Sequence, residues 1–239
     1  MQYMIVQTHR QLWILKGGSL FCTFFLFHLF SLAQSKTSFT GMLEYKITVR
    51  DTSLRNFFPD NTMAIYTNDT VVRQENYTPQ LGQQVNIRHI EKNKSYLLLQ
   101  TDFGKFAIPS DLNALMAKDS SKHESKYTFT KKGGSRKIVG QKAKRMLVTH
   151  PDSEEIFEFW YFKKIDGKYN DAFKELPGLP VKYSVVTPDA VFDYELVRFV
   201  AYTPNRDMFG VPSDFERINF DEFIERMLAA KGSGEITPE

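Results

Sequence analysis

Hydrophobic and polar residues alternate along much of this chain with a period of two. The clearest case is Gly41–Arg50, in which Leu43, Tyr45, Ile47 and Val49 alternate with charged or hydroxyl-bearing side chains. This alternation is typical of a β-strand with one buried face. Similar segments follow in neighbouring pairs: Thr62–Thr67 and Thr70–Asn76, Gln84–Glu91 and Ser95–Thr101, and Val181–Thr187 and Val191–Tyr202. We therefore expect a mainly β fold in which sequence neighbours pair as antiparallel hairpins.

The stretch Lys137–Tyr183 combines two strand-like segments with a rigid corner. The segments Ala143–Thr149 and Glu155–Phe162 are joined by the turn-forming residues His150–Ser153, and Leu176–Pro180 reads Leu-Pro-Gly-Leu-Pro. Proline fixes φ and lacks a backbone donor, whereas glycine permits positive φ. The corner therefore cannot continue as a helix, and we expect it to set the direction of the strand that follows.

The segment Glu155–Phe162 is apolar on both faces. Its large side chains alternate, with Phe157, Phe159 and Tyr161 on one face and Ile156, Trp160 and Phe162 on the other. A strand of this kind needs cover on both faces. One cover is the interior of a curved sheet and the other a helix or a neighbouring molecule; an ordinary core strand with a few exposed aromatics is the alternative. We predict that any ligand site lies beside Phe157, Phe159, Trp160 and Tyr161.

A glycine pair beside lysine occurs in Lys132–Ser135, between Tyr127–Lys131 and Arg136–Val139. Its spacing does not match the phosphate-binding pattern G-x-x-x-x-G-K-[ST]. A hairpin turn is the better interpretation, because glycine supplies the positive φ that tight turns require.

A few short helices are expected beside the strands. The first follows Ser110 or Asp111 and ends near Lys118, and the second covers Lys168–Lys174. The third is amphipathic and begins after Asn219 or Asp221. Its apolar face carries Phe223, Ile224, Met227 and Leu228. The fold class is therefore mainly β with a few helices (α+β), with the last helix docked on the sheet or closing its open side.

The first 33 residues have the signals of an export sequence. Arg10 and Lys16 precede the apolar run Leu20–Leu32, and the small residues of Ser31-Leu32-Ala33, at positions −3 and −1, predict cleavage before Gln34. The apolar run is about 13 residues long, shorter than the roughly 20 that span a bilayer, which disfavours a membrane anchor. We expect a signal peptide over 1–33, one β domain over 34–230 and a flexible tail over 231–239, in a protein that is periplasmic, outer-membrane-associated or secreted.

The composition after residue 33 excludes several classes of function. The single cysteine, Cys22, lies in the predicted signal peptide, so the mature chain has no disulfide and no thiol nucleophile. Lipid attachment to Cys22 is disfavoured because the bulky Phe21 stands where a small residue is needed. The remaining 29 Lys and Arg against 28 Asp and Glu give no general reason to expect nucleic acid as a partner.

The chain shows no catalytic or metal-binding pattern. His89, His123 and His150 are far apart, and none lies in an H-E-x-x-H motif. There is no G-x-S-x-G motif. The acidic residues Asp152, Glu154 and Glu155 fall at an expected hairpin tip, where such groups are usually solvated. We therefore expect no enzyme, no cofactor and no metal, although sequence alone leaves a carboxylate pair assembled across strands open.

Several short motifs resemble one group of exported proteins. They are Ile138–Lys144, Trp160-Tyr161, Leu176–Pro180 and Val211–Phe223, in this order behind an expected signal peptide. In this respect the chain resembles the Gram-negative GLPGLI and LolA-like periplasmic families. The family pattern G-[YF]-x-C-x-K corresponds to Gly140–Lys144, with Ala143 where cysteine is frequent. The resemblance implies a curved antiparallel sheet or half-open β-barrel covered by short helices, an architecture whose relatives carry lipids or lipoproteins.

Two classes of function follow from these observations. The first is an exported, non-enzymatic protein that binds a lipid or another hydrophobic ligand between a curved β-sheet and helices. The alternative is a structural or adaptor protein of the cell envelope that binds a protein partner through exposed aromatics. The first predicts an apolar cavity, and the second a solid core beneath a flat apolar patch. Neither requires a transmembrane span in the mature chain.

Overall fold

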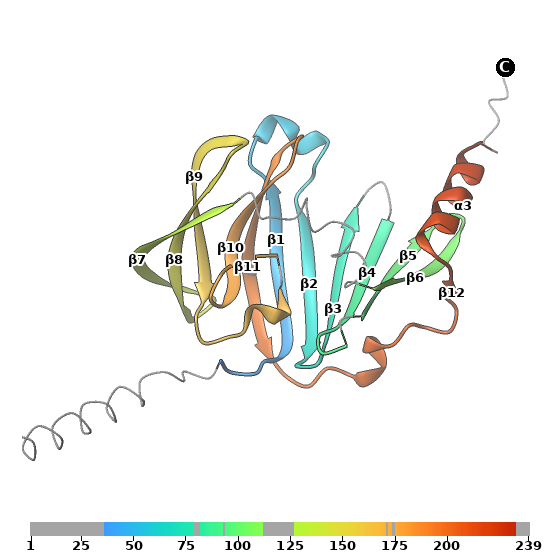
Figure 1. The fold of residues 1–239 in the computed structure, drawn as a ribbon, viewed down its shortest axis with the longest axis horizontal. Helices are drawn as coiled ribbons and strands as arrows, with labels where there is room; N and C mark the ends of the chain where they lie inside the picture. The colour runs from blue at the N-terminus through green and yellow to red at the C-terminus, as the bar shows by residue number, and fades with distance from the viewer. Residues whose placement is uncertain are drawn as a thin grey trace, which may run out of the picture. The chain divides into compact units, whose positions relative to one another are not determined.

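The strands of this protein form one open, curved sheet (Figure 1). The computed structural model describes residues 36–78, 82–92, 94–111, 127–170, 172–173 and 175–232. Twelve strands lie in the order β12-β6-β5-β4-β3-β2-β1-β11-β10-β9-β8-β7. Among the described residues β7 and β12 each pair on one side only, so the sheet does not close. The prediction of a mainly β fold is confirmed.

Most strands that are neighbours in sequence pair as antiparallel partners, as expected, and β12 with β6 is the only pair of strands described as parallel. The longer strands are β1 (Thr40–Val49), β7 (Thr128–Ile138), β8 (Gln141–His150), β9 (Ser153–Phe162) and β11 (Val191–Ala201). The shorter strands are β2 (Asn61–Asn68), β3 (Val71–Thr78), β4 (Gly82–His89), β5 (Lys94–Thr101), β6 (Gly104–Asp111), β10 (Leu179–Val186) and β12 (Glu216–Arg217).

Strand β1 lies at the centre of the sheet and defines its two faces. Leu43 and Tyr45 are fully buried on what we call the core face, and Leu43 lies between Ile65 of β2 and Phe199 of β11. The alternate residues of β1 form the outer face. The main hydrophobic core combines the core faces of β1, β2 and β11 with buried residues of β7–β10.

Two smaller clusters stabilise the β3–β6 half of the sheet. Phe209 and its neighbours in the segment 208–215 cover Val85, Ile87 and Leu98. Helix α3 (Phe220–Gly232) covers β5 and β6 through Phe223. Asn219 accepts a hydrogen bond of 2.8 Å from the Glu222 backbone N–H, which confirms it as the N-cap. Within the described residues no helix is both long and apolar enough to cross a membrane.

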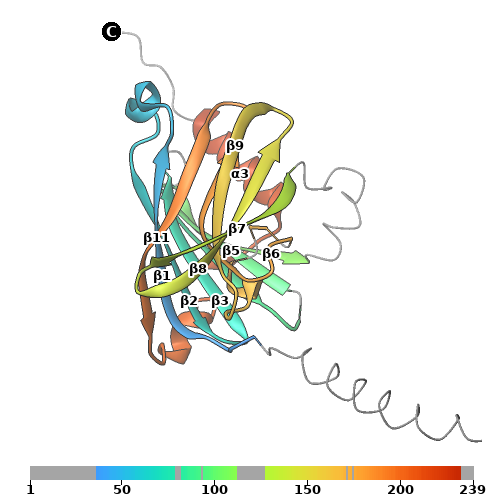
Figure 2. The same cartoon turned by 90° about the vertical axis from the view of Figure 1, so that its left-hand side faces the viewer.

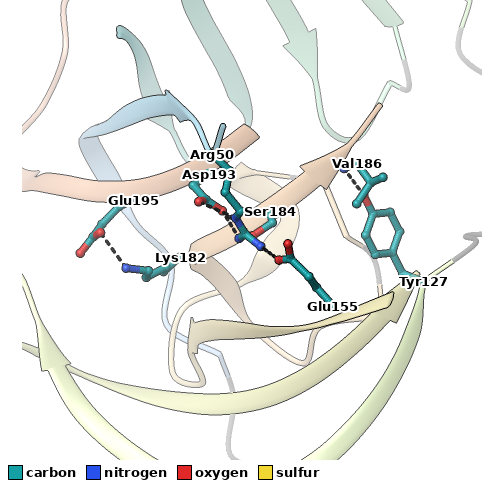
Figure 3. Close-up of polar contacts among 8 residues, drawn as sticks. All are labelled: Arg50, Tyr127, Glu155, Lys182, Ser184, Val186, Asp193 and Glu195. Carbon is teal, nitrogen blue, oxygen red and sulfur yellow. Dashed lines mark hydrogen bonds and ion pairs between the residues drawn. The ribbon is translucent and has the colours of Figure 1, made fainter. Parts of the chain in front are cut away.

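The sheet curves strongly at its β7–β11 end (Figure 2). The Tyr127 hydroxyl, beside β7, accepts a hydrogen bond of 2.7 Å from the backbone N–H of Val186 at the end of β10, although β8 and β9 separate these strands in the sheet. Arg50, next to β1, likewise reaches Glu155 of β9 (Figure 3). Such contacts require the sheet to bend back on itself.

One expected hairpin turn lies elsewhere in the structure. The glycine pair in Lys132–Ser135 does not form a hairpin turn: β7 runs through it, and the pairing with β8 is irregular between Lys131 and Ser135. The turn is instead at Val139 and Gly140, both with positive φ. Glycine is common both where strand pairing is irregular and in tight turns, so composition did not separate the two.

The expected helices differ in outcome. The predicted helix Lys168–Lys174 is wrong, since Gly167–Tyr169 form the short 3-10 helix η2 and Asn170 is extended. Two further 3-10 helices, η1 (Thr52–Asn56) and η3 (Arg206–Phe209), were not predicted. The expected helix ending near Lys118, the signal peptide and most of the expected tail lie outside the described residues.

The first described residues form hydrogen bonds to η2 and to the turn that precedes it. The Thr37 backbone N–H donates to Lys164 O at 2.7 Å, and that of Phe39 donates to the Tyr169 hydroxyl at 2.7 Å. Tyr169 in turn donates to Asp69, whose carboxylate also pairs with Lys168 at 2.7 Å. Burial by itself would raise the pKa of Asp69, but hydrogen bonds from Lys168, Tyr169 and Ser38 together hold it below its ordinary value.

We expect the Asp69→Asn variant to be less stable than the parent by about 1 kcal/mol at neutral pH. Asparagine tolerates the positive φ of 77° at this position, so the change removes mainly the charge. Because the folded pKa is depressed, this contribution is present above the unfolded value of about 3.9 and is lost as the pH falls through the folded value. Urea unfolding across acidic pH should show the two proteins converging, whereas the exposed control Glu154→Gln should match the parent throughout. A constant difference at all pH values would contradict the assignment.

Candidate functional site

An apolar pocket opens at the end of the sheet where β1 leads into η1. Its volume is about 530 Å³. Most of its lining is apolar, and consists of Ile47, Val49, Phe57, Phe58, Pro59, Asp60, Asn61, Asn76, Tyr77, Val185, Thr187, Phe192 and Tyr194. These residues come from β1, β2, β3, β10, β11 and the η1–β2 connection, so the pocket exists only in the folded sheet.

The register of the sheet explains why the pocket is apolar. Ile47 and Val49 continue the core face of β1 beyond the buried Tyr45, and they lie opposite Tyr194 and Phe192 of β11. Val185 of β10 pairs with Phe192 from the other side. The core face therefore remains apolar up to the end of the strands, past the point where the main core covers it. Burial raises the pKa of Tyr194, which keeps its hydroxyl neutral.

The η1 segment provides one wall of the pocket. Asp51 caps η1 by accepting a hydrogen bond of 2.9 Å from the Ser53 backbone N–H. The two phenylalanines after η1 then extend over the pocket: Phe58 packs edge-to-face on Phe192 with centroids 5.3 Å apart, and Phe57 is 70% exposed. Across the opening, Tyr77 is 55% exposed. Large exposed aromatics beside an apolar cavity are unfavourable in water unless something covers them.

The polar groups of the pocket lie at its rim. Asp60 is the only charged residue in the lining, and its carboxylate pairs with Lys46 at 2.9 Å. Asn61 donates to the backbone carbonyl of Tyr77. Thr187 accepts a hydrogen bond of 3.1 Å from the Ala190 N–H, which closes the β10–β11 turn. An apolar cavity with a few polar groups at its edge is the usual composition of a small-ligand site.

A second cavity, of about 340 Å³, lies on the outer face of the same strands and is polar. Arg50 donates to both oxygens of Asp193 and to the Ser184 hydroxyl (Figure 3). The pKa of Arg50 is raised, chiefly by its hydrogen bonds to Asp193. Lys182 pairs with Glu195 at 2.9 Å. These charges neutralise one another across β1, β10 and β11, so the cavity is best explained as a structural clamp.

The polar cavity contains no assembled catalytic group. Ser184 is 4% exposed, and its hydroxyl donates to Asp193 at 2.7 Å while accepting from Arg50. A hydroxyl held in this way has no free neighbouring base, because the Asp193 carboxylate is already engaged by the guanidinium. Among the described residues no group of three or more His, Cys, Asp and Glu residues could hold a metal ion.

The four predicted ligand-binding residues lie elsewhere, inside the main core. Phe157, Phe159, Trp160 and Tyr161 are all at most 8% exposed, and none lines the apolar pocket. Trp160 is covered on the outer face by the Arg136 guanidinium, 4.3 Å from the ring centroid. The predicted cover on both faces is present only over Phe159–Phe162, because Glu155, Ile156 and Glu158 are exposed.

The sequence contains one signal for the pocket that the interpretation above did not use. Phe57, Phe58 and Pro59 form an apolar group within an otherwise polar connection between two strands. Phe58 packs on Phe192, but Phe57 stays exposed, so this group points to a surface site. The remaining lining residues are ordinary strand positions, and only the register brings them together.

The histidines are not brought together. His150 is buried, its ring lies 4.6 Å from that of Tyr127, and its Nδ1 accepts a hydrogen bond of 3.2 Å from the Asp152 backbone N–H. His89 lies at the end of β4, and His123 is outside the described residues. His150 therefore has a structural place in the β8–β9 turn.

Comparison with known proteins adds no relative from which a role could be transferred. The resemblance to the GLPGLI and LolA-like families accordingly stays a prediction from the motifs. No family model matches the chain, and no curated protein matches its sequence.

Proposed function

We propose that this chain is an exported, non-enzymatic binding protein that holds a lipid acyl chain or a similar hydrophobic ligand in the apolar pocket. The observation that carries the proposal is the pocket itself: about 530 Å³ on the core face, with exposed Phe57 and Tyr77 at its opening. Its volume lies in the range of about 300–1,000 Å³ that small-ligand sites occupy. Each CH₂ group that an acyl chain buries there contributes roughly 0.8 kcal/mol before ordering costs.

The open, curved sheet fits this role. In a half-open barrel a ligand can enter from the end without unfolding any strand, and η1 would act as the cover that the sequence resemblance assigns to helices. Export remains the expectation from residues 1–33, and it would place the pocket in a compartment rich in lipids.

The proposal is tested by asking what the protein carries. Native mass spectrometry of protein purified from its own cell envelope should show a bound apolar molecule, which delipidation removes. Adding the extracted lipid back to the delipidated protein should restore the adduct. A protein that is empty on purification and takes up no acyl compound would refute the proposal.

Filling the pocket should weaken ligand binding. We expect Val185→Trp, at a half-buried lining position, to lower the affinity for an acyl probe by about tenfold or more, because the indole occupies the space and each 1.4 kcal/mol is tenfold. The matched control is Val197→Trp, at an exposed position of β11 outside the pocket. Fluorescence titration with a labelled fatty acid measures both. Equal affinities in the two variants would place the ligand elsewhere.

One observation also favours the alternative of an envelope adaptor. Phe57, Tyr77 and Ile156 are all more than half exposed, and they lie at the same end of the sheet. A protein partner could cover them together. Crosslinking in intact cells should then recover one consistent partner, and the triple serine variant should lose it. The pocket is unnecessary for this role, so the Val185→Trp variant separates the two proposals.

A further inference from the structure

The β7–β8 hairpin carries an unusual concentration of positive charge. Residues 127–151 contain seven basic residues and no acidic one; the basic residues are Lys131, Lys132, Arg136, Lys137, Lys142, Lys144 and Arg145. The rest of the chain after residue 33 has 22 Lys and Arg against 28 Asp and Glu. The nearly neutral total therefore conceals a basic hairpin on an otherwise acidic protein.

The positive charge is densest at the tip of this hairpin. The turn Val139-Gly140 brings Arg136 and Lys137 of β7 beside Lys142 and Lys144 of β8. Strand β9 ends at the same place, because Lys144 pairs with Tyr161. The turn after β9 therefore adds two further lysines, Lys163 and Lys164, both exposed. We call these six residues the basic end: Arg136, Lys137, Lys142, Lys144, Lys163 and Lys164.

No ion pair neutralises the basic end in the part of the chain that the structure describes. Among the described residues no carboxylate forms an ion pair with any of its six cations. The nearest acidic residue in sequence, Asp166, pairs with Lys36 at 3.6 Å. Lysines on an edge strand also prevent unwanted strand pairing, but Lys163 and Lys164 lie in a turn, where that purpose does not apply.

The basic end and the apolar pocket lie at opposite ends of the strands. β10 begins at Leu179, opposite Phe162 beside the basic end, and it reaches the pocket at Val185. Six residues of extended strand separate the two positions by roughly 20 Å. A partner that binds the basic end would therefore leave the opening of the apolar pocket accessible.

We propose that the basic end docks the protein on the surface of a bilayer that contains anionic phospholipids. The cations occupy both strands of a ribbon and an adjacent turn, and no described pocket is lined by any of them. A broad negative surface engages such a distribution without a groove, and each basic residue near it contributes a factor of about five in affinity. The docked orientation leaves the apolar pocket facing away from that bilayer. The proposal does not depend on what the pocket binds.

Vesicle sedimentation tests the proposal directly. The full mature chain should sediment with phosphatidylcholine vesicles that contain phosphatidylglycerol, should not sediment with phosphatidylcholine alone, and should be released by high salt. The variant K137Q/K142Q/K163Q/K164Q should bind at least about tenfold more weakly, since four exposed cations are lost. The variant K163Q/K164Q alone should be intermediate.

The matched control removes the same charge from other surfaces. In K46Q/R55Q/K94Q/K105Q four exposed cations away from the basic end are replaced, and its vesicle affinity should stay within about threefold of the parent, because distant exposed charges are screened. Similar losses in both quadruple variants would reduce the effect to net charge and overturn the proposal. So would equal binding to neutral vesicles, or binding to polyglutamate with none to anionic vesicles, which would identify an acidic protein as the partner.

Discussion

Replacing Phe159 by alanine should lower the free energy of unfolding by about 3–5 kcal/mol, the range for removing a buried aromatic side chain. The Phe159 side chain is fully buried, and its ring lies 4.9 Å from that of Phe173, centroid to centroid. It also contacts Tyr127, Phe129 and Tyr183. Alanine would leave a cavity among these rings that they cannot close, because each is fixed by its own strand or hydrogen bond. Urea unfolding followed by circular dichroism measures the change.

The neighbouring Ile156 supplies the control for this prediction. It lies on the same strand but is 65% exposed, so Ile156→Ala should change the free energy of unfolding by less than about 0.5 kcal/mol. The comparison also bears on function. If Phe159→Ala left stability unchanged and removed ligand binding, the ring would belong to a ligand site, as the sequence suggested, and its place in the core would need another explanation.

The strands were the most predictable part of this fold, for a physical reason. Residues such as Leu43 and Tyr45 must face the core while their neighbours face water, and the pleat converts that requirement into an alternating sequence. The same rule predicted cover on both faces of Glu155–Phe162, and the structure shows it for Phe159–Phe162. Alternation does not say what the cover is, however, and a core strand and a ligand-lining strand give the same pattern.

The pocket could not be predicted because its lining residues are not neighbours in the sequence. Val49, Tyr77 and Val185 meet only through the order and register of five strands, which the hydrophobic pattern leaves open. The basic end was missed for a related reason. The net charge of the whole chain is near zero and hides the excess of positive charge on the hairpin. Lys163 lies near Lys142 only because β8 pairs with β9. The candidate sites therefore depend on tertiary structure, whereas the strands depend on local pattern.

The Leu-Pro-Gly-Leu-Pro corner, in contrast, was recognised from sequence, and the structure shows why its glycine is needed. A Cβ atom at Gly178 would lie 2.2 Å from the carbonyl oxygen of Phe162 and 3.1 Å from the Cα of Lys163. Both are backbone atoms, so no side-chain rotation relieves the contact. The corner thus holds the end of β9 against the start of β10 at a distance that only glycine permits.

We expect Gly178→Ala to lower the free energy of unfolding by about 3 kcal/mol, at the upper end of the range for overpacking. To accept the methyl group the chain must move Gly178 away from Phe162. That movement disturbs the Leu179 N–H···O=C hydrogen bond to Ile165, 3.0 Å long, and the Tyr45 hydroxyl bond to Pro180 O, 2.7 Å long. Tyr45 is fully buried, so its hydroxyl has no water to replace the lost acceptor. Thermal unfolding of the purified variant provides the measurement.

Gly133→Ala is the matched control, because an added Cβ there meets nothing within 4 Å and the residue has no positive φ. It should be neutral or should stabilise the protein by up to about 1 kcal/mol, since alanine reduces the freedom of the unfolded chain. Both glycines lie in segments that the sequence marks as turns, and composition predicts the same cost for each. A large difference between the two variants would show that the close approach of two backbones, and not turn conformation, requires glycine in the corner; equal effects would contradict the contact at Phe162.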